Sequence, residues 1–293
     1  MLAVVGTLPE EDFPLIMGTV ELKGRELLLE GRQIPVTRGT AALLGAAGAA
    51  LKILNKPPPL AFLVGDTGLG RGSQRLYEYV AQELGTHRLR VLAFHYILPQ
   101  VDWHAQVYFA LERLNPRPFL IADAGFMYVA KMSGLAPAYD LFTPDVGELA
   151  FLADEEAPHP FYTRGFILTQ DDRVPELISR AYVHGNAARY LLVKGQTDYV
   201  ADRQGIVATI SEPQVEALEA VGGTGDTLTG MVAALINAGW EIVPAAVLAA
   251  RANRLAGKLS GASPATSVAE IVEHIPLALK ELLEGFRPDL EAG

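Results

Sequence analysis

Short continuous runs of hydrophobic residues alternate along this chain with longer stretches in which apolar residues recur at helical spacing. The continuous runs are typical of strands buried on both faces, and they predict strands at residues 60–64, 91–98, 119–122, 165–169 and 190–193. The periodic stretches predict helices at residues 75–84, 103–114, 175–184, 226–238 and 244–260. This alternation favours a three-layer α/β/α sandwich around a mostly parallel sheet.

The first 36 residues have a different pattern. Residues 20–22 and 26–29 form two short strand-like runs on either side of Gly24, which predicts a β-hairpin. The hairpin is either a pair of strands at the edge of the sheet or a small lid. We therefore expect one α/β domain over residues 1–293, with an N-terminal hairpin or edge segment at residues 1–36.

Composition and charge narrow the classes of function. Lys plus Arg is 24 and Asp plus Glu is 34, so the formal net charge is −10, which disfavours a general nucleic-acid binder. The absence of Cys excludes disulfides, thiolate catalysis and Cys-ligated metal sites. The six His residues are scattered and show no close metal-type pairing.

The chain shows no targeting or membrane pattern. Its N-terminus lacks a basic segment followed by a long apolar run, and the longest apolar stretch, residues 41–51, is about half the length of a membrane span. We expect a cytoplasmic protein that binds neither membrane nor nucleic acid, and a homo-oligomer is compatible with the sequence.

The strongest chemical motif is the sequence Gly-Gly-Thr-Gly-Asp at residues 222–226, directly before a predicted helix. Glycines at a helix N-terminus leave backbone N–H groups open to an anion, and the helix dipole favours the same charge. Asp226 would repel that anion, but it suits a general base that takes a proton from a hydroxyl attacking a phosphoryl group. The alternative is that Asp226 is a plain helix N-cap after a flexible loop.

A second motif places Asp145 and Glu148 at the start of a helix after Thr143-Pro144. Carboxylates three residues apart lie on one helical face and can hold hydrated Mg²⁺ together with substrate phosphates. Ordinary helix-start charge, with Pro144 as the first helical residue, is the competing interpretation.

Three weaker signals lie where predicted strands end. Gly68 and Gly70 belong to a glycine turn, Asp123 follows the strand at 119–122, and Lys194-Gly195 follows the strand at 190–193. Open α/β sheets bind ligands at the carboxyl ends of their strands, although each signal alone also fits a solvated strand end.

Taken in order, these motifs resemble those of the ribokinase-like superfamily, and most of all those of the ATP- or ADP-dependent NAD(P)H-hydrate dehydratases. The resemblance covers about residues 37–260 and implies ATP or ADP and Mg²⁺ as cofactors and a small-molecule substrate. It implies the following roles: Asp226 as base; Gly222, Gly223, Thr224 and Gly225 as anion hole; Lys194, Gly195 and Asn253 at the nucleotide; Glu148 and Asp145 at the metal; Asp123, Gly68 and Gly70 near the substrate.

The chain also departs from the dehydratase pattern. Asp145 stands where these enzymes usually carry His, an extra strand and helix occupy residues 88–114, and the N-terminal glycine loop is reduced to residues 38–40. These departures fit equally a sugar, nucleoside or vitamin-precursor kinase. Two alternatives of other classes are a catalytically inactive nucleotide-binding regulator, against which Asp226 argues, and a dehydrogenase built on residues 65–72, for which the strand at 91–98 lacks the acid that would bind ribose.

Overall fold

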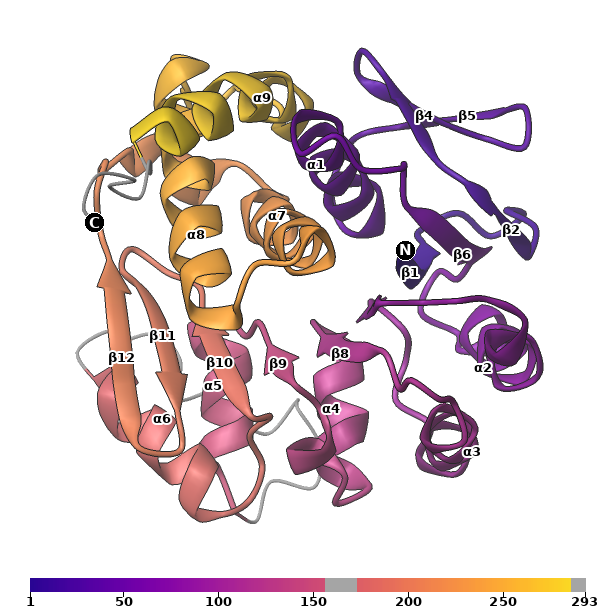
Figure 1. Cartoon of the computed structure of the whole chain (residues 1–293). Coiled ribbons are helices and arrows are strands. Elements are labelled where there is room, and N and C mark those ends of the chain that lie inside the picture. The colour runs from indigo at the N-terminus through magenta and orange to yellow at the C-terminus, as the bar shows by residue number, and fades with distance from the viewer. Residues whose placement is uncertain (156–172, 286–293) are drawn as a thin grey trace, which may run out of the picture.

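The computed structural model describes residues 1–155 and 173–285. Within these residues the chain forms a nine-stranded sheet with helices on both faces (Figure 1). In spatial order the strands are β12 (Gly205–Ile210), β11 (Asp198–Asp202), β10 (Tyr190–Val193), β9 (Leu141–Phe142), β8 (Phe119–Ala122), β7 (Val91–His95), β1 (Leu2–Leu8), β6 (Leu60–Gly65) and β2 (Ile16–Thr19). The strands from β10 to β6 are parallel, and antiparallel strands extend both edges.

The helices form a layer on each face of the sheet, and a separate buried apolar cluster lies under each layer. One layer consists of α1 (Thr40–Ile53), α7 (Thr224–Ala238), α8 (Ile242–Leu259) and α9 (Val268–Gly285). The other consists of α2 (Arg71–Glu83), α3 (Val101–Glu112), α4 (Gly125–Met132), α5 (Val146–Ala153) and α6 (Val174–Val183). The expected three-layer α/β/α sandwich with a mostly parallel sheet is confirmed.

The N-terminal segment differs from the expectation in one important respect. β1 is a central strand, paired in parallel with both β6 and β7, and all seven of its residues are buried. Its sequence is a continuous, mostly apolar run of the kind that predicts a buried strand. The expected strand at 165–169 lies outside the described residues.

The predicted hairpin at Gly24 exists, but it is not an edge pair of the large sheet. β3 (Glu21–Lys23), β4 (Glu26–Leu29) and β5 (Arg32–Pro35) form a separate three-stranded sheet beside α1 (Figure 1). The edge strand of the large sheet next to β6 is instead β2. Leu27 and Leu29 of β4 are buried, so this small sheet extends the core over α1.

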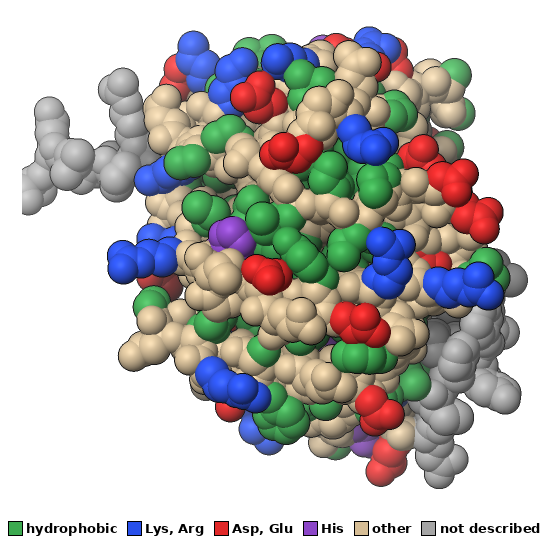
Figure 2. All heavy atoms as spheres, turned by 90° about the vertical axis from the view of Figure 1, so that its right-hand side faces the viewer, with side chains coloured by type: hydrophobic (Ala, Val, Ile, Leu, Met, Phe, Trp, Pro, Cys, Tyr) green, Lys and Arg blue, Asp and Glu red, His purple; other side chains and the backbone are tan. Residues whose placement is uncertain are grey.

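The face of the molecule seen in Figure 2 carries Lys and Arg side chains interspersed with Asp and Glu. Hydrophobic side chains lie between these charges, and this face shows no continuous basic stripe of the kind that follows a nucleic-acid backbone. Among the described residues, every helix is too short or too polar to span a membrane.

The contact between α1 and α7 positions the glycine turn. Gly230 of α7 lies so close to α1 that a Cβ atom added to it would lie 2.2 Å from the carbonyl oxygen of Leu43. The small residues of α1 permit this approach, since most of its buried positions are Ala or Gly. The N-termini of both helices consequently lie side by side, and the amide of Gly39 reaches the Asp226 side chain.

We predict that Gly230→Ala destabilises the protein by about 1–3 kcal/mol, because the added methyl group overpacks a closed helix contact. Gly48→Ala in α1 is the matched control, since its Cβ would meet Leu22 at an ordinary 3.5 Å and alanine favours the helix. Urea unfolding measures both free energies. Equal stability of the two variants would show that α1 and α7 can separate without cost.

Candidate active site

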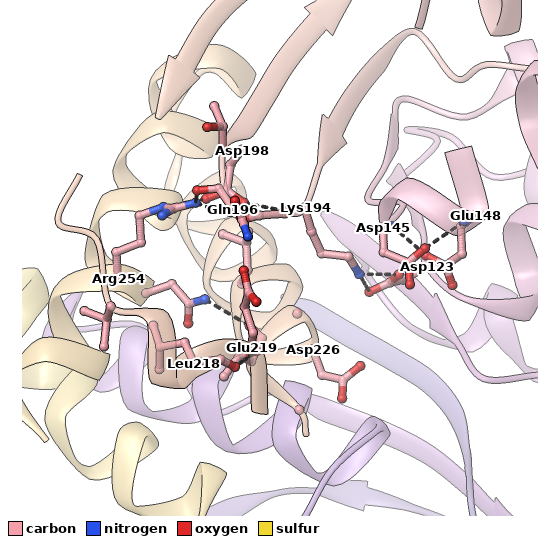
Figure 3. A pocket seen from close by; sticks show the side chains of 18 of the residues that line it. Asp123, Asp145, Glu148, Lys194, Gln196, Asp198, Leu218, Glu219, Asp226 and Arg254 are labelled. Atoms are coloured by element: carbon pink, nitrogen blue, oxygen red, sulfur yellow. Dashed lines mark hydrogen bonds and ion pairs between the residues drawn. The ribbon is translucent and has the colours of Figure 1, made fainter. Parts of the chain in front are cut away.

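A cavity of about 920 Å³ opens at the carboxyl ends of the central strands and beside the N-terminus of α7. Its lining includes Asp123 after β8, Lys194 after β10 and Asp226 in α7. Figure 3 shows these three side chains converging, with the Lys194 ammonium pointing at Asp123. This is the edge at which open α/β sheets bind their ligands.

The glycine turn has the geometry of an anion site. Gly223 is the N-cap of α7 and has a φ of 105°, a left-handed conformation that favours glycine. α7 begins at Thr224, two residues before the predicted start. In the described part of the chain, the N–H groups of Thr224, Gly225 and Asp226 have no protein acceptor, as expected for a first helical turn. These amides line the cavity.

Asp226 is not the helix N-cap, so the alternative interpretation of this residue is wrong. Its Oδ2 accepts a hydrogen bond of 2.6 Å from Gly39 N, and its Oδ1 lies 3.0 Å from His95 Nε2. Burial acts to raise the pKa of Asp226, but His95, Lys194 and the Gly39 amide outweigh it and lower that pKa. The carboxyl is therefore ionised and can accept a proton.

Asp123 and Lys194 form a buried ion pair. Lys194 Nζ lies 2.8 Å from Asp123 Oδ1 and 3.0 Å from Oδ2. Burial acts to lower the pKa of Lys194, but the carboxylates of Asp123, Glu148 and Asp226 raise it above its usual value. Lys194 is thus a fixed positive charge between the carboxylates, and its side chain lies 3.4 Å from where a Cβ atom on Gly225 of the glycine turn would be.

Asp145 and Glu148 lie on the same side of the cavity and cap α5 reciprocally (Figure 3). Asp145 Oδ1 accepts from Glu148 N, and Glu148 Oε2 accepts from Asp145 N. Pro144 precedes this cap and is not the first helical residue. Burial and the Asp145 carboxylate raise the pKa of Glu148 well above its usual value. One oxygen of each side chain stays outside the reciprocal cap, so the pair suits a hydrated divalent cation, which would relieve the crowded negative charge.

Two cavity residues that the sequence did not single out have left-handed backbones. Tyr96 has a φ of 53° and Ala124 a φ of 52°. This conformation is costly for residues other than glycine and clusters at functional sites. The positive φ of Tyr96 coincides with the end of β7 at His95, three residues earlier than predicted. Tyr96 is 52% exposed and lines the cavity together with Asp226.

His95 is a third residue that the sequence did not reveal. It is fully buried at the end of β7, between Thr40 and Asp226. His95, Asp123 and Asp226 form a close group of possible ligand atoms, so the scattered histidines of the sequence do include one beside two carboxylates. Only the three-dimensional pairing of β7 with α7 reveals it, because 131 positions separate His95 from Asp226.

Three predicted site residues do not line the cavity: Gly222, Gly68 and Gly70. The turn containing Gly68 and Gly70 is closed by Asp66, whose carboxylate accepts from the amides of both glycines and of Ser73. A carboxylate on these amides occupies the place that a dinucleotide pyrophosphate would need. The arrangement argues against the dehydrogenase alternative.

The far end of the cavity is built around Arg254. This buried side chain bonds Asp198 at 2.8 Å and the backbone oxygens of Gly195 and Gln196. It thereby fixes the loop after β10 to α8 (Figure 3). Asn253, predicted at the nucleotide, lines the same end, but its amide is bonded to Thr224 O and Thr227 Oγ1 and so supports the glycine turn.

The fold defines a class of proteins. A ribokinase-like superfamily protein of Enterococcus faecalis superposes with a TM-score of 0.57 at 14% identity, over 96% of this chain and 86% of that one. The ADP/ATP-dependent NAD(P)H-hydrate dehydratase of Bacillus subtilis, crystallised with ATP and Mg²⁺, gives 0.54 at 18% identity, over 96% and 89%. The chain therefore has the ribokinase-like fold.

Sequence similarity then gives the family within this class. Residues 86–276 match the profile of the family described as NAD(P)H-hydrate dehydratase, and the chain belongs to that family. An uncharacterised protein of Methanocaldococcus jannaschii is 39% identical over 243 residues, which is 83% of this chain and 100% of that protein. A bifunctional NAD(P)H-hydrate repair enzyme of Mycobacterium leprae is 32% identical over 186 residues, or 61% of this chain, which spans 35% of that enzyme's length.

We predict that Lys194→Met lowers the free energy of unfolding by about 3–5 kcal/mol, because it leaves the buried Asp123 carboxylate without its counter-charge. Adding Asp123→Asn to this variant should restore part of the loss, since it removes that charge. Lys52→Met, at an exposed lysine of α1, is the control and should change stability by less than about 0.5 kcal/mol. Urea unfolding measures the free energies. Equal losses of stability in Lys194→Met and Lys52→Met would show that the Asp123 carboxylate does not need Lys194.

Proposed function

We propose that the protein uses ATP or ADP to dehydrate hydrated NAD(P)H, by phosphorylating the hydrate and then eliminating phosphate. One observation carries this proposal. An ionised carboxylate, Asp226, and the unbonded amides of a glycine turn face the same cavity. A base and an anion site at one place suit transfer of a phosphoryl group to a hydroxyl.

The first step follows from these positions. Asp226 takes the proton from the hydroxyl of the hydrate while the hydroxyl oxygen attacks the terminal phosphoryl group of the nucleotide. The bond between that phosphorus and the bridging oxygen breaks, and the shortened nucleotide leaves. The N–H groups of Thr224, Gly225 and Asp226 hold the oxygens of the transferring group, with Lys194 as an adjacent positive charge.

The second step restores the dihydronicotinamide. The carbon–oxygen bond to the new phosphate breaks with help from the ring nitrogen's electron pair, and the neighbouring carbon loses a proton. We place the reacting ring against Tyr96, whose exposed aromatic face lies beside Asp226 and offers a flat apolar surface. The adenine lies at the other end of the cavity, near the loop of Lys194 and Gly195 and near Asn253.

Mg²⁺ fits the carboxylate pair of Asp145 and Glu148 in the cavity lining. Glu148 and Asp145 would hold it through water, and bound there it would neutralise phosphate charge. The raised pKa of Glu148 supports this role, because a cation relieves the repulsion that keeps its proton in place. Asp123 is bonded to Lys194 and stays beside the substrate as a fixed negative charge.

A small-molecule kinase is the second candidate. Asp145 stands where the related dehydratases usually carry His, and this change touches the side of the cavity that meets the phosphates. In a kinase the phosphate stays on a sugar, nucleoside or vitamin precursor, and the first step is unchanged. An inactive nucleotide-binding regulator is disfavoured, because an ionised Asp226 beside the anion site weakens phosphate binding.

The decisive assay follows NADH formation from hydrated NADH at 340 nm, with ATP or ADP and Mg²⁺. We expect turnover by the wild type and a loss of about 10²–10⁴-fold in Asp226→Asn, which keeps the shape but cannot accept the proton. Nucleotide affinity should be equal or higher in this variant. Phosphorylated product without NADH would identify a kinase, and wild-type turnover by Asp226→Asn would exclude Asp226 as the base.

We predict that Glu148→Gln raises the Mg²⁺ concentration needed for half-maximal rate, because the amide binds a cation more weakly than the carboxylate does. Asp145→Asn should have a smaller effect. Glu112→Gln, on the exposed end of α3, is the control and should leave the Mg²⁺ dependence unchanged. Full activity of the wild type in excess chelator would show that the reaction does not need a divalent cation.

A further inference from the structure

His95 joins the two helix N-termini of the site to the end of β7. Its Nε2 lies 3.0 Å from Asp226 Oδ1, and its Nδ1 lies 3.0 Å from Thr40 Oγ1. The ring is fully buried and does not line the cavity, so it reaches the reaction only through Asp226.

The hydrogen bonds around the ring determine where its protons lie. Thr40 Oγ1 donates its single proton to Thr7 O, 2.8 Å away, so it must accept from His95 Nδ1–H. On its other side, Nε2 faces Asp226 Oδ1 at 3.0 Å and Asp123 Oδ2 at 3.7 Å. A bare nitrogen lone pair would repel both carboxylates, and a cation or a proton must therefore lie between them.

Asp123 decides against a metal ion at this place. Its Oδ1 accepts from Ala124 N and Lys194 Nζ, and its Oδ2 accepts from Lys194 Nζ and Thr229 Oγ1. Both oxygens are thus saturated, with no free electron pair for a metal. A proton on Nε2 satisfies the same geometry, donates to Asp226 and balances one of the two negative charges.

We propose that His95 is a positioning residue for the base Asp226, doubly protonated and held by Thr40, so that one carboxylate oxygen is fixed on His95 while the carboxylate stays ionised. This proposal rests on the proposed function. Gly39 N fixes the other oxygen in the same way. Each oxygen keeps an electron pair for the substrate proton, and the carboxylate cannot rotate away from the glycine turn.

His95→Phe should show this role in the pH dependence of the rate. The charged or titratable groups around Asp226 are His95, Lys194, Asp123, Glu148 and Tyr96. His95 lowers the pKa of Asp226, so its removal raises that pKa, and the acid limb of the kcat profile should move to higher pH. We expect kcat to fall by about 10²-fold, as for a misplaced catalytic group, with the KM for nucleotide unchanged.

Two variants serve as controls. His95→Gln keeps an N–H donor for Asp226 and should recover part of kcat. His104→Phe removes another buried histidine, bonded at 2.8 Å to both Tyr139 and Ser133 and outside the cavity lining. It should lower thermal stability without moving the acid limb. A His95→Phe profile that matches the wild type or His104→Phe would overturn the proposal.

A spectroscopic measurement on the wild type provides a test that needs no turnover. In ¹⁵N-histidine NMR of the full chain, one histidine should show two protonated nitrogens, and this signal should be absent in His95→Gln. An unprotonated nitrogen on His95 at the pH of the assay would overturn the proposal. Failure of the wild type to act on hydrated NADH or any acceptor would count against the proposed function alone.

Discussion

The close approach of α1 and α7 is the constraint on which the site depends. Because Gly230 lets the two helices touch, their N-termini open at one place, and each contributes a backbone amide or side chain to Asp226 and its neighbours. A wider contact would carry Gly39 and Thr40 away from Asp226 and His95. The base would then face solvent, and its orientation would be lost. Helix packing and catalytic geometry are thus parts of one arrangement.

Charge balance explains why so many carboxylates can share one cavity. Asp123 is matched by Lys194, Asp226 by His95 and the Gly39 amide, and Asp145 and Glu148 cap a helix. In this last pair, burial and then the neighbouring Asp145 carboxylate raise the pKa of Glu148. The site is therefore divided into a side that supplies positive potential through amides and Lys194 and a side that suits a cation.

The parts of the site that local sequence determines could be predicted. The glycine turn with Asp226, the Asp145–Glu148 cap and the strand-end residues Asp123 and Lys194 are each encoded within a few positions. Gly68 and Gly70 were assigned to the site by resemblance, but the carboxylate of Asp66 closes their turn. That closure depends on a side-chain rotamer and could not be read from the spacing of the glycines.

The parts that long-range pairing determines could not be predicted. His95 and Tyr96 have no motif, and they enter the site because β7 lies beside β1 and ends at a left-handed residue. Apolar periodicity predicts the α/β/α layers, but it does not predict β12, which is largely exposed, or β11, whose short apolar run is flanked by Asp198 and Asp202. Periodicity identifies what is buried, but it does not identify which neighbour buries it.

The central place of β1 has a consequence for the order in which the chain assembles. β1 pairs on one side with β6, which follows α1 in the chain, and on the other side with β7, which follows α2. β1 can therefore pair with β6 early, but the backbone groups on its other edge have no strand partner until β7 has been synthesised. The two halves of the sheet join through this strand, so we infer that its pairing with β7 completes the sheet late in folding, and with it the alignment of His95 with Asp226.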